Sequence, residues 1–260
     1  MQQDISITIE SGVQTLRFTR PEKKNALTAA MYTAMNAALE MGDASEDVAA
    51  HLIIGSGGTF TAGSDVGEFL ERSRSNVDLT LPIVQFIRRL PLVRKPMIAA
   101  VDGPAVGIGT TMLLHCDLVY ATPQASFRTP FLDLGLVPEA GSSLLAPRLF
   151  GYQRAFELLA LGEPFSAERA REAGLIDAIV PAEALEATAR KAASGLAAKP
   201  PEALAATRAL MRGDPQAVRA RIDEEVRIFA ERLASPEARE AFNAFLEKRP
   251  ADFSRARSKD

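Results

Sequence analysis

The chain has 260 residues, of which 47% are hydrophobic and 24% charged, and its formal net charge is −3. This composition excludes wholesale disorder and supplies the core of one large domain, or of one domain with an appendage. The small negative charge argues against a nucleic-acid or anionic-membrane partner, because both require a dominant positive field. A single cysteine, Cys116, excludes an internal disulfide framework. No apolar run approaches the roughly 20 residues that span a bilayer, and the first ten residues do not resemble a secretion signal, so we expect a cytoplasmic protein.

The first segments predict a β-hairpin followed by a helix. Apolar residues alternate with polar ones over residues 5–9 and 16–18, and Ser11-Gly12 lies in the break between the two runs. The apolar period then changes to four from Leu27 to Leu39, with Thr28 as the expected cap.

Three later apolar runs, at residues 52–54, 97–101 and 118–120, do not alternate. Such runs are typical of strands buried on both faces of a parallel sheet. Stretches of helical character lie between them, at residues 81–90 and 108–114. This order predicts βαβ units with helices covering the sheet.

The chain beyond residue 160 is mainly helical by pattern. One strand signal remains at residues 175–180, and the pairs Asp214-Pro215 and Ser235-Pro236 each predict a helix start. An apolar stripe at helical spacing follows, comprising Val218, Ile222, Val226, Phe229 and Leu233. This stripe must be buried against either the main domain or another subunit.

The common catalytic and metal-binding motifs are absent from the sequence. There is no P-loop, no dinucleotide-binding glycine pattern and no Gly-x-Ser-x-Gly elbow. Neither His51 nor His115 has a cysteine or carboxylate at metal-ligand spacing, so we predict no metal site. Cys116 lies in an apolar stretch and is interpreted as a core residue.

Two glycine-rich loops, residues 55–65 and 102–109, follow predicted strands. Each loop places unpaired backbone N–H groups at a helix start, and two such loops that converge would form an oxyanion hole. The simpler interpretation is that the glycines only permit tight turns, and spacing alone favours it.

A family resemblance adds to this pattern. The segments that carry it are Arg20–Leu27, Thr61–Asp65, Val101–Gly109, Cys116–Ala121 and Phe127–Glu139. In order and spacing they resemble the crotonase, or enoyl-CoA hydratase/isomerase, superfamily, over residues 5 to about 180. Residues 240–249 are also similar to the last helix of that family.

The resemblance implies an α/β fold, a crotonase-like spiral of ββα repeats with a C-terminal helical trimerisation region. We therefore expect residues 1–195 to form the spiral core with the CoA and active sites. Residues 196–260 would form the C-terminal helical region that mediates oligomerisation, as a homotrimer or a dimer of trimers. The implied partner is an acyl-CoA thioester substrate, with no separate cofactor. By position, the backbone N–H groups of Ser64 and Ile108 would hold the thioester carbonyl.

The carboxylates decide which reaction to expect. Members of the family that hydrate 2-enoyl thioesters typically use two glutamates, but the matching positions here are Thr111 and Phe131. Neither residue is a general base, so ordinary hydratase activity is not expected. The segment containing Glu139 is instead similar to Δ3,Δ2-enoyl-CoA isomerases of the peroxisomal type and their bacterial relatives. In that group this glutamate is the catalytic base that moves a proton between C2 and C4.

Glu139 could instead have a purely structural role, because a carboxylate just before the helix predicted to start at Ser142 would interact favourably with the dipole of that helix.

Other site positions also follow from the resemblance. Phe131 and Leu136 would form an apolar wall that excludes water. Asp65 is expected to order its loop or cap a helix. The positions assigned to substrate or CoA binding are Lys23, Lys24, Ala26, Ala62, Asp65, Val66, Gly107, Phe131 and Leu136.

Lys23 and Lys24 would contact the CoA phosphates, although two exposed lysines in a turn are common.

The sequence also leaves other functions open. One is an enzyme for an unusual acyl-CoA, such as a ring or epoxide intermediate of aromatic catabolism, and another is a weak enoyl-CoA hydratase. A third is an acyl-CoA binding protein without turnover. The final Ser258-Lys-Asp260 differs from the peroxisomal Ser-Lys-Leu signal, which favours a bacterial-type cytoplasmic protein.

Overall fold

The computed structural model describes residues 4–65, 67, 81–247 and 249–254. It begins with the predicted hairpin, in which β1 (Ile5–Glu10) pairs antiparallel with β2 (Val13–Phe18). Ser11 and Gly12 form the two-residue turn, and both have positive φ, 49° and 78°. A turn of this kind matches the right-handed twist of the strands.

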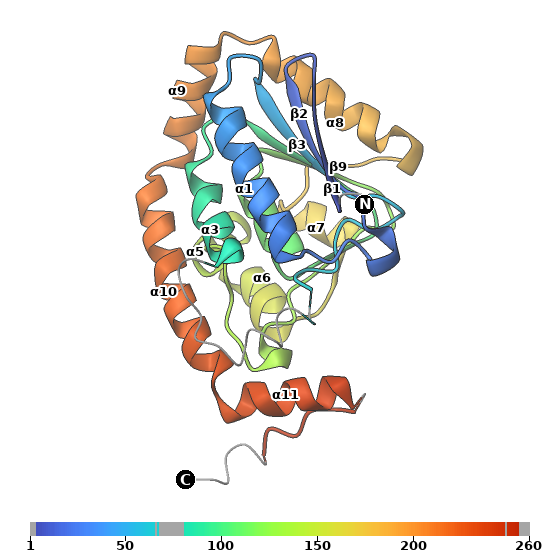
Figure 1. Ribbon diagram of the computed structural model, residues 1–260, viewed down its shortest axis with the longest axis vertical. Coiled ribbons are helices and arrows are strands. Elements are labelled where there is room, and N and C mark those ends of the chain that lie inside the picture. Colours follow the sequence, from blue (N-terminus) through green and yellow to red (C-terminus); the bar gives the residue numbers. More distant parts are fainter. Residues whose placement is uncertain (1–3, 66, 68–80, 248, 255–260) are drawn as a thin grey trace.

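A six-stranded sheet forms the centre of the molecule (Figure 1), in the order β1-β2-β3-β4-β6-β9. The added strands are β3 (Ala50–Ile54), β4 (Met97–Val101), β6 (Leu118–Ala121) and β9 (Ala178–Ile179). All pairings from β2 onward are parallel, which confirms the sheet predicted from the non-alternating runs. The last predicted strand is shorter than its apolar run of residues 175–180.

Helices cover both faces of this sheet. On β3, Ile53 packs into the main core cluster with helix α1 (Ala29–Ala44), while Leu52 and Ile54 face helix α8 (Ala182–Ala197) on the other side. Thr28 caps α1 as predicted, because its side chain accepts a hydrogen bond from the N–H of Met31. Burial on both faces is the physical reason why β3 and β4 do not alternate.

A second sheet of three short strands was not apparent from periodicity. It consists of β5 (Pro104–Val106), β7 (Ser126–Arg128) and β8 (Phe165–Ser166) in that order. Strands β5 and β7 are parallel, and β8 pairs antiparallel with β7. Strands this short carry no readable alternation, but this sheet supports the second glycine loop.

The remaining helical elements connect these sheets. The helices are α3 (Pro82–Arg89), α4 (Ile108–Thr111), α5 (Ser142–Phe150), α6 (Tyr152–Phe156), α7 (Ala167–Ala173), α9 (Pro201–Arg212), α10 (Pro215–Leu233) and α11 (Pro236–Leu246). The 3₁₀ turns are η1 (Pro21–Lys23), η2 (Leu90–Leu92), η3 (Met112–His115) and η4 (Leu132–Leu134), and η5 (Glu157–Leu161) is a π-helical turn. The predicted helical stretch at residues 108–114 is therefore α4 followed by η3.

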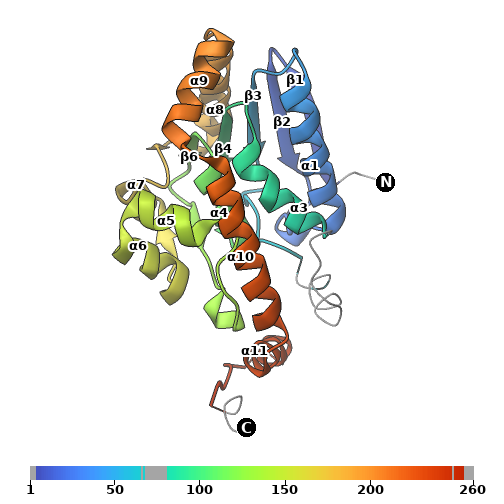
Figure 2. The same ribbon diagram turned by 90° about the vertical axis from the view of Figure 1, so that its left-hand side faces the viewer.

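The C-terminal helices pack on the same chain (Figure 2). Helix α10 lies against α3 and α5 and leads to α11 at one end of the molecule. Asp214 and Ser235 cap α10 and α11 as predicted. Four of the five stripe residues on α10 are buried, and Phe229 is half-buried, so the stripe packs on the main domain. The boundary predicted after residue 195 falls in the last turn of α8, and the division into two domains stays a prediction.

Within the described ranges, no helix is both long and apolar enough to cross a bilayer.

A buried ion pair attaches α9 to the sheet. Arg208 is 9% exposed, and its Nε contacts both carboxylate oxygens of Asp117 at 2.9 and 2.8 Å. Asp117 in turn accepts a hydrogen bond from the N–H of Met97 at the start of β4 (2.8 Å), and Arg212 approaches it at 3.1 Å. Asp117 is therefore the point at which α9 and the central sheet meet.

We predict that Arg208→Ala lowers the free energy of unfolding by about 3 kcal/mol, because it leaves Asp117 with a single arginine and removes a buried partner. Urea denaturation measures this change. Arg227→Ala is the matched control, because Arg227 is exposed and, among the described residues, pairs with Glu231 on the same helix. The control should change stability by no more than about 0.5 kcal/mol, and equal effects of the two variants would contradict the assigned role of Arg208.

Candidate active site

The first glycine loop presents the backbone N–H of Ser64. Leu27 forms a parallel bridge with this loop, in which its N–H donates to the Gly63 carbonyl (2.8 Å) and its carbonyl accepts from the Asp65 N–H (2.9 Å). A parallel bridge of this type directs the intervening N–H, that of Ser64, away from Leu27. Within the described residues, no hydrogen bond uses this N–H.

The second loop presents the N–H of Ile108, the first residue of α4. Gly107 precedes it with φ 57° and ψ −121°, a conformation that favours glycine. The N–H of Ile108 has no partner within the helix, because the first donors of a helix never do. The described part of the chain offers it no other acceptor.

Backbone hydrogen bonds join the two loops. The N–H of Thr61 donates to the Pro104 carbonyl and the N–H of Val106 donates to the Thr61 carbonyl, both at 3.0 Å. A Cβ atom at Gly109 would lie 2.5 Å from Cγ2 of Thr61, so glycine is needed for this close approach. The two candidate donors, Ser64 and Ile108, therefore lie on adjacent, connected segments.

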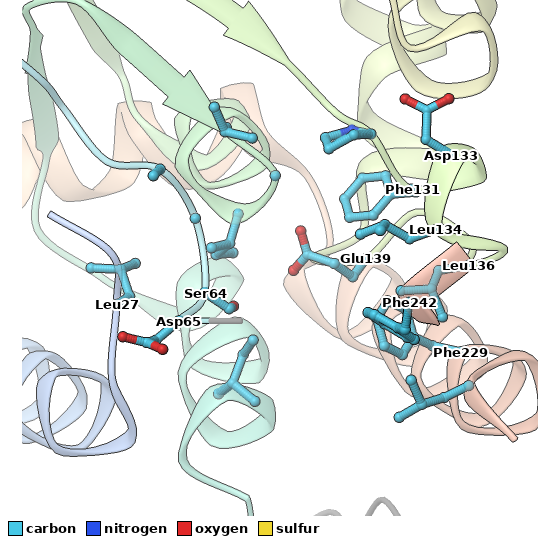
Figure 3. A pocket seen from close by; sticks show the side chains of 18 of the residues that line it. Leu27, Ser64, Asp65, Phe131, Asp133, Leu134, Leu136, Glu139, Phe229 and Phe242 are labelled. Atoms are coloured by element: carbon cyan, nitrogen blue, oxygen red, sulfur yellow. The ribbon is translucent and has the colours of Figure 1, made fainter. Parts of the chain in front are cut away.

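Glu139 lies opposite these loops, between η4 and α5. Its side chain is buried, with 6% exposed, and Oε1 accepts a hydrogen bond from Oγ1 of Thr111. Oε2 is buried and has no hydrogen-bond partner among the described residues. Figure 3 shows the carboxylate facing Ser64 across the cavity, with the ring of Phe131 beside it. Thr111 therefore holds one oxygen of Glu139 and leaves the other available.

Burial raises the pKa of Glu139 to about 8. The hydrogen bond from Thr111 opposes this change, and the nearby carboxylate of Glu225 adds to it. A carboxyl group with this pKa exchanges a proton near neutral pH, as acid–base catalysis requires.

Glu225, on α10, is the carboxylate that holds the start of α5. It accepts hydrogen bonds from the N–H groups of Gly141 (2.6 Å) and Ser143 (3.0 Å). A negative charge that interacts with the N-terminus of α5 was the structural role considered for Glu139. Glu225 fits this role better. Glu225 was not predicted as a site residue, although a carboxylate three residues after Ile222, next to an apolar stripe, was a readable signal.

The space between the loops and Glu139 is a cavity of about 630 Å³ with a mainly apolar lining. Phe131 and Leu136, predicted as an apolar wall, are both buried and line it (Figure 3). Ala62, Ser64, Asp65, Gly107 and Ile108 line the same cavity. The C-terminal helices contribute Phe229, Leu233 and Phe242, which the sequence analysis did not assign to the site.

Asp65 is held by one contact to the segment before η1 and one within its own chain segment. Its carboxylate pairs with Arg20 at 2.7 Å and accepts from the N–H of Gly67 at 3.0 Å. Its neighbour Val66, also predicted to bind substrate, lies outside the described residues. Ser64 has a further contact, a hydrogen bond of 2.8 Å between its hydroxyl and that of Tyr32 on α1.

The turn that carries Lys23 and Lys24 lies next to the first loop. Both lysines are exposed, and the carbonyl of Lys24 accepts from the N–H of Ala62 (2.9 Å). The side chain of Asn25, which the sequence analysis did not single out, donates to the carbonyls of Ser56 and Thr59 and holds the turn in place. Contact between these lysines, or Ala26, and the CoA part of a ligand stays a prediction.

The histidines have partners that account for their burial. His51 contacts Gln14 (2.8 Å), and Nε2 of His115 contacts the Ala140 carbonyl (2.7 Å). The described residues contain no group of three or more His, Cys, Asp or Glu side chains suited to a metal ion. Burial raises the pKa of the Cys116 thiol to about 12, which makes it a poor nucleophile.

Two connected backbone donors that face a buried carboxylate across an apolar cavity form an arrangement that can stabilise an oxyanion next to an acid–base group. The enoyl-CoA hydratase/isomerase family model matches residues 8–256. The chain belongs to this family, the crotonase family, and has its mixed α/β fold with C-terminal helices.

Known relatives support this assignment. The chain is 34% identical to 1,2-epoxyphenylacetyl-CoA isomerase of Escherichia coli, over 98% of this chain and 99% of the relative. It is 31% identical to enoyl-CoA delta isomerase 2 of Rattus norvegicus, over 95% of this chain and 64% of that longer relative. An enoyl-CoA hydratase/isomerase structure from Pseudoalteromonas atlantica matches with a TM-score of 0.91 and 38% identity, covering 96% of this chain and all of the other.

The names of the relatives include a hydratase and a dehalogenase besides isomerases. This chain is therefore a crotonase-family acyl-CoA enzyme, and the family alone does not define its reaction.

We predict that Glu139→Gln stabilises the protein, and increasingly so as pH rises. The pKa of Glu139 is about 8 in the folded state and about 4.3 in an unfolded chain. Because the folded state holds the proton more tightly, wild-type stability falls as pH rises between these values and is constant above them. Glutamine carries no charge and avoids this loss, which amounts to up to about 5 kcal/mol.

Urea denaturation at pH 5, 7 and 9 measures the difference. Glu224→Gln, on α10, is the control, because this side chain is 55% exposed and should show no such trend. A constant difference between Glu139→Gln and wild type across this range would show that the carboxyl group is not buried as described.

Proposed function

We propose that the protein is an isomerase that shifts the double bond of 3-enoyl-CoA to give trans-2-enoyl-CoA. One observation carries the proposal: Glu139 keeps one carboxylate oxygen free at a cavity whose opposite wall presents the N–H groups of Ser64 and Ile108. An isomerase of this kind requires one base and an oxyanion site, and it requires nothing to activate water.

The proton balance needs only Glu139. Its Oε2 removes a proton from C2, and the electron pair moves onto the thioester oxygen to give a dienolate. The same carboxyl group then returns the proton to C4, so the double bond moves to C2=C3 and the enzyme is regenerated. Thr111 holds Oε1 throughout, which fixes the orientation of Oε2.

Most of the rate enhancement would come from the oxyanion site. The N–H groups of Ser64 and Ile108 would bind the thioester oxygen, where negative charge develops. Each such donor contributes about 3–4 kcal/mol to the stability of the transition state in enzymes where it has been removed. Glu139 would add roughly 10²–10⁴-fold as an acid–base catalyst.

The cavity also supports isomerisation over hydration. Thr111 and Phe131 occupy the positions at which the resemblance puts the hydratase glutamates. Thr111 is engaged with Glu139, and Phe131 presents a phenyl ring to the cavity. Neither Thr111 nor Phe131 supplies a carboxylate that could activate a water molecule at these two positions.

The same proposal includes the partners predicted from the sequence. The substrate is an acyl-CoA thioester, with CoA as part of the substrate and no further cofactor. A homotrimer or dimer of trimers and a cytoplasmic location complete the proposal.

We expect purified protein to convert 3-hexenoyl-CoA to the conjugated 2-enoyl thioester, followed by ultraviolet absorbance. Glu139→Gln should lower kcat at least 100-fold, because glutamine cannot accept the proton from C2. Full turnover in Glu139→Gln would overturn the mechanism. Glu224→Gln is the matched control and should keep wild-type kcat.

Deuterium exchange at C2 of a saturated acyl-CoA is a second measurement, since it reports enolisation whatever the product. Tight binding of the thioester with no exchange would identify the protein as an acyl-CoA binding protein without turnover.

The dependence of kcat/KM on pH should show an acidic limb near the pKa of Glu139, which is about 8. Activity should rise as pH increases through this value, because only the deprotonated carboxylate can take the proton from C2. A stopped assay between pH 5.5 and 9.5 measures this limb. A value of kcat/KM that does not change with pH over this range, as for a glutamate of ordinary pKa, would contradict the described burial of Glu139.

A second candidate is isomerisation of a ring-containing acyl-CoA. It is favoured by the similarity to 1,2-epoxyphenylacetyl-CoA isomerase and by the aromatic side chains of Phe131, Phe229 and Phe242 in the cavity. A panel of straight-chain and aryl acyl-CoA esters, compared by kcat/KM, separates the two candidates. A preference for the aryl esters of at least tenfold would favour the second.

A further inference from the structure

Glu225 is a carboxylate buried on the apolar face of α10. It lies three residues after Ile222 and four before Phe229, and it is only 4% exposed. A buried charge costs several kcal/mol unless hydrogen bonds compensate for it. A glutamate at this position therefore needs specific hydrogen-bond donors as partners.

Those partners belong to the segment that follows Glu139. Oε2 of Glu225 accepts from the N–H of Gly141 at 2.6 Å. Oε1 accepts from the N–H of Ser143 at 3.0 Å and from its hydroxyl at 2.5 Å. All three donors lie two or four residues after Glu139, so Glu225 binds the stretch of chain that carries that side chain.

This stretch has an unfavourable backbone conformation. Ala140 and Gly141 both have positive φ, 57° and 73°. For alanine the left-handed conformation is unfavourable, because Cβ comes too close to the following carbonyl oxygen, and it persists only where the surroundings enforce it. A buried turn of this type therefore depends on the contacts made from either side.

Two elements enclose the turn. On one side, His115 contacts the Ala140 carbonyl through Nε2 (2.7 Å), and burial lowers the pKa of His115 to about 4, so the ring is neutral and donates this bond. On the other side, α10 supplies Glu225, together with Val218 and Ile222. A Cβ added at Gly141 would lie 3.0 and 3.4 Å from their side chains.

We propose that Glu225 is a positioning residue for Glu139: it fixes the turn that carries the catalytic carboxylate and places a negative charge behind it. The inference rests on the proposed function, because it takes Glu139 to be the base. It assigns to the C-terminal helical region a direct effect on proton transfer, in addition to its contribution to the cavity wall.

The electrostatic effect follows from the unequal partners of the two carboxylates. Burial raises the pKa of Glu225 as well, and the hydrogen bonds from Ser143 and Gly141 oppose that rise. Glu225 accepts three hydrogen bonds and Glu139 one, so Glu225 is the carboxylate better able to hold the negative charge. Its charge raises the pKa of Glu139, whereas the hydrogen bond from Thr111 lowers it.

Other charged groups around the turn are engaged elsewhere. Arg221 donates to the hydroxyl of Ser143 (3.3 Å) and pairs with Glu224. Asp65, on the facing loop, pairs with Arg20, and Asp133, on η4, pairs with Arg128. Among the described residues, Glu225 is therefore the carboxylate whose charge acts on Glu139.

Two substitutions with opposite effects test the proposal. Glu225→Gln removes the charge and should move the acidic limb of kcat/KM to lower pH by about one unit. It should also lower kcat at high pH at least tenfold while KM stays within twofold, because a displaced base affects the chemical step. Thr111→Val removes the opposing hydrogen bond and should move the limb to higher pH.

Glu224→Gln is the matched control, since it neutralises the adjacent, exposed carboxylate of the same helix and should leave the limb unchanged. A Glu225→Gln protein with a lower Tm but the wild-type limb and kcat would overturn the proposal, because Glu225 would then serve only to cap α5. If Glu225→Gln does not fold, Glu225→Asp keeps the charge on a shorter side chain. It should lower kcat and keep the limb, and wild-type kcat in this variant would also overturn the proposal.

A titration of the free protein separates this proposal from the proposed function. With 13C-labelled glutamate, NMR follows the Glu139 carboxyl carbon directly, and Glu139→Gln assigns its signal. A lower pKa of Glu139 in Glu225→Gln would support the coupling even if 3-hexenoyl-CoA were not a substrate. An unchanged titration would reject the coupling even if the isomerase activity were confirmed.

Discussion

The two backbone hydrogen bonds that join Thr61 to Pro104 and Val106 are the contacts on which the site depends. They bring a loop following the large sheet alongside a strand of the small one, and thereby bring Ser64 and Ile108 to the same cavity wall. The absence of a side chain at Gly109 permits the approach, since a Cβ there would overlap Thr61. Both donors are backbone groups, so their positions are set by the fold and their side chains are free to vary.

Glu139, in contrast to the two backbone donors, acts through a side chain that the fold must bury. Burial makes a carboxylate more basic but also less stable in its charged form. The chain compensates locally: Thr111 binds one oxygen, His115 holds the Ala140 carbonyl, and Glu225 holds the next N–H groups. Two segments far apart in sequence, residues 111–115 and α10, thus converge on the turn that carries Glu139. The stability lost at this turn is recovered by packing elsewhere, as is common where a site needs a strained or desolvated group.

Much of the fold could be predicted from local patterns. The hairpin at Ser11-Gly12, the cap at Thr28 and the helix starts at Asp214 and Ser235 are confirmed, because each depends on residues close together in sequence. The small sheet could not be predicted from periodicity, since strands of two or three residues have no measurable period.

The site residues likewise divide into those that the sequence indicated and those that it did not. Ser64, Ile108 and Glu139 lie at one cavity, as the family resemblance implied, and their roles remain proposals. Glu225, Asn25 and the aromatic wall from α10 and α11 act through contacts between distant segments, which no local pattern contains.

The position of α10 near the end of the chain has a consequence for synthesis. Residues 5–150 supply the donors, the base and Thr111, but the helix that supports the base and closes the cavity is translated only after residue 214. A nascent chain that has folded its sheet therefore presents an open, apolar cleft and an unsupported turn at Ala140 until α10 leaves the ribosome. Since exposed apolar surface favours aggregation, the interval before α10 docks is the stage at which this chain would most benefit from chaperone protection.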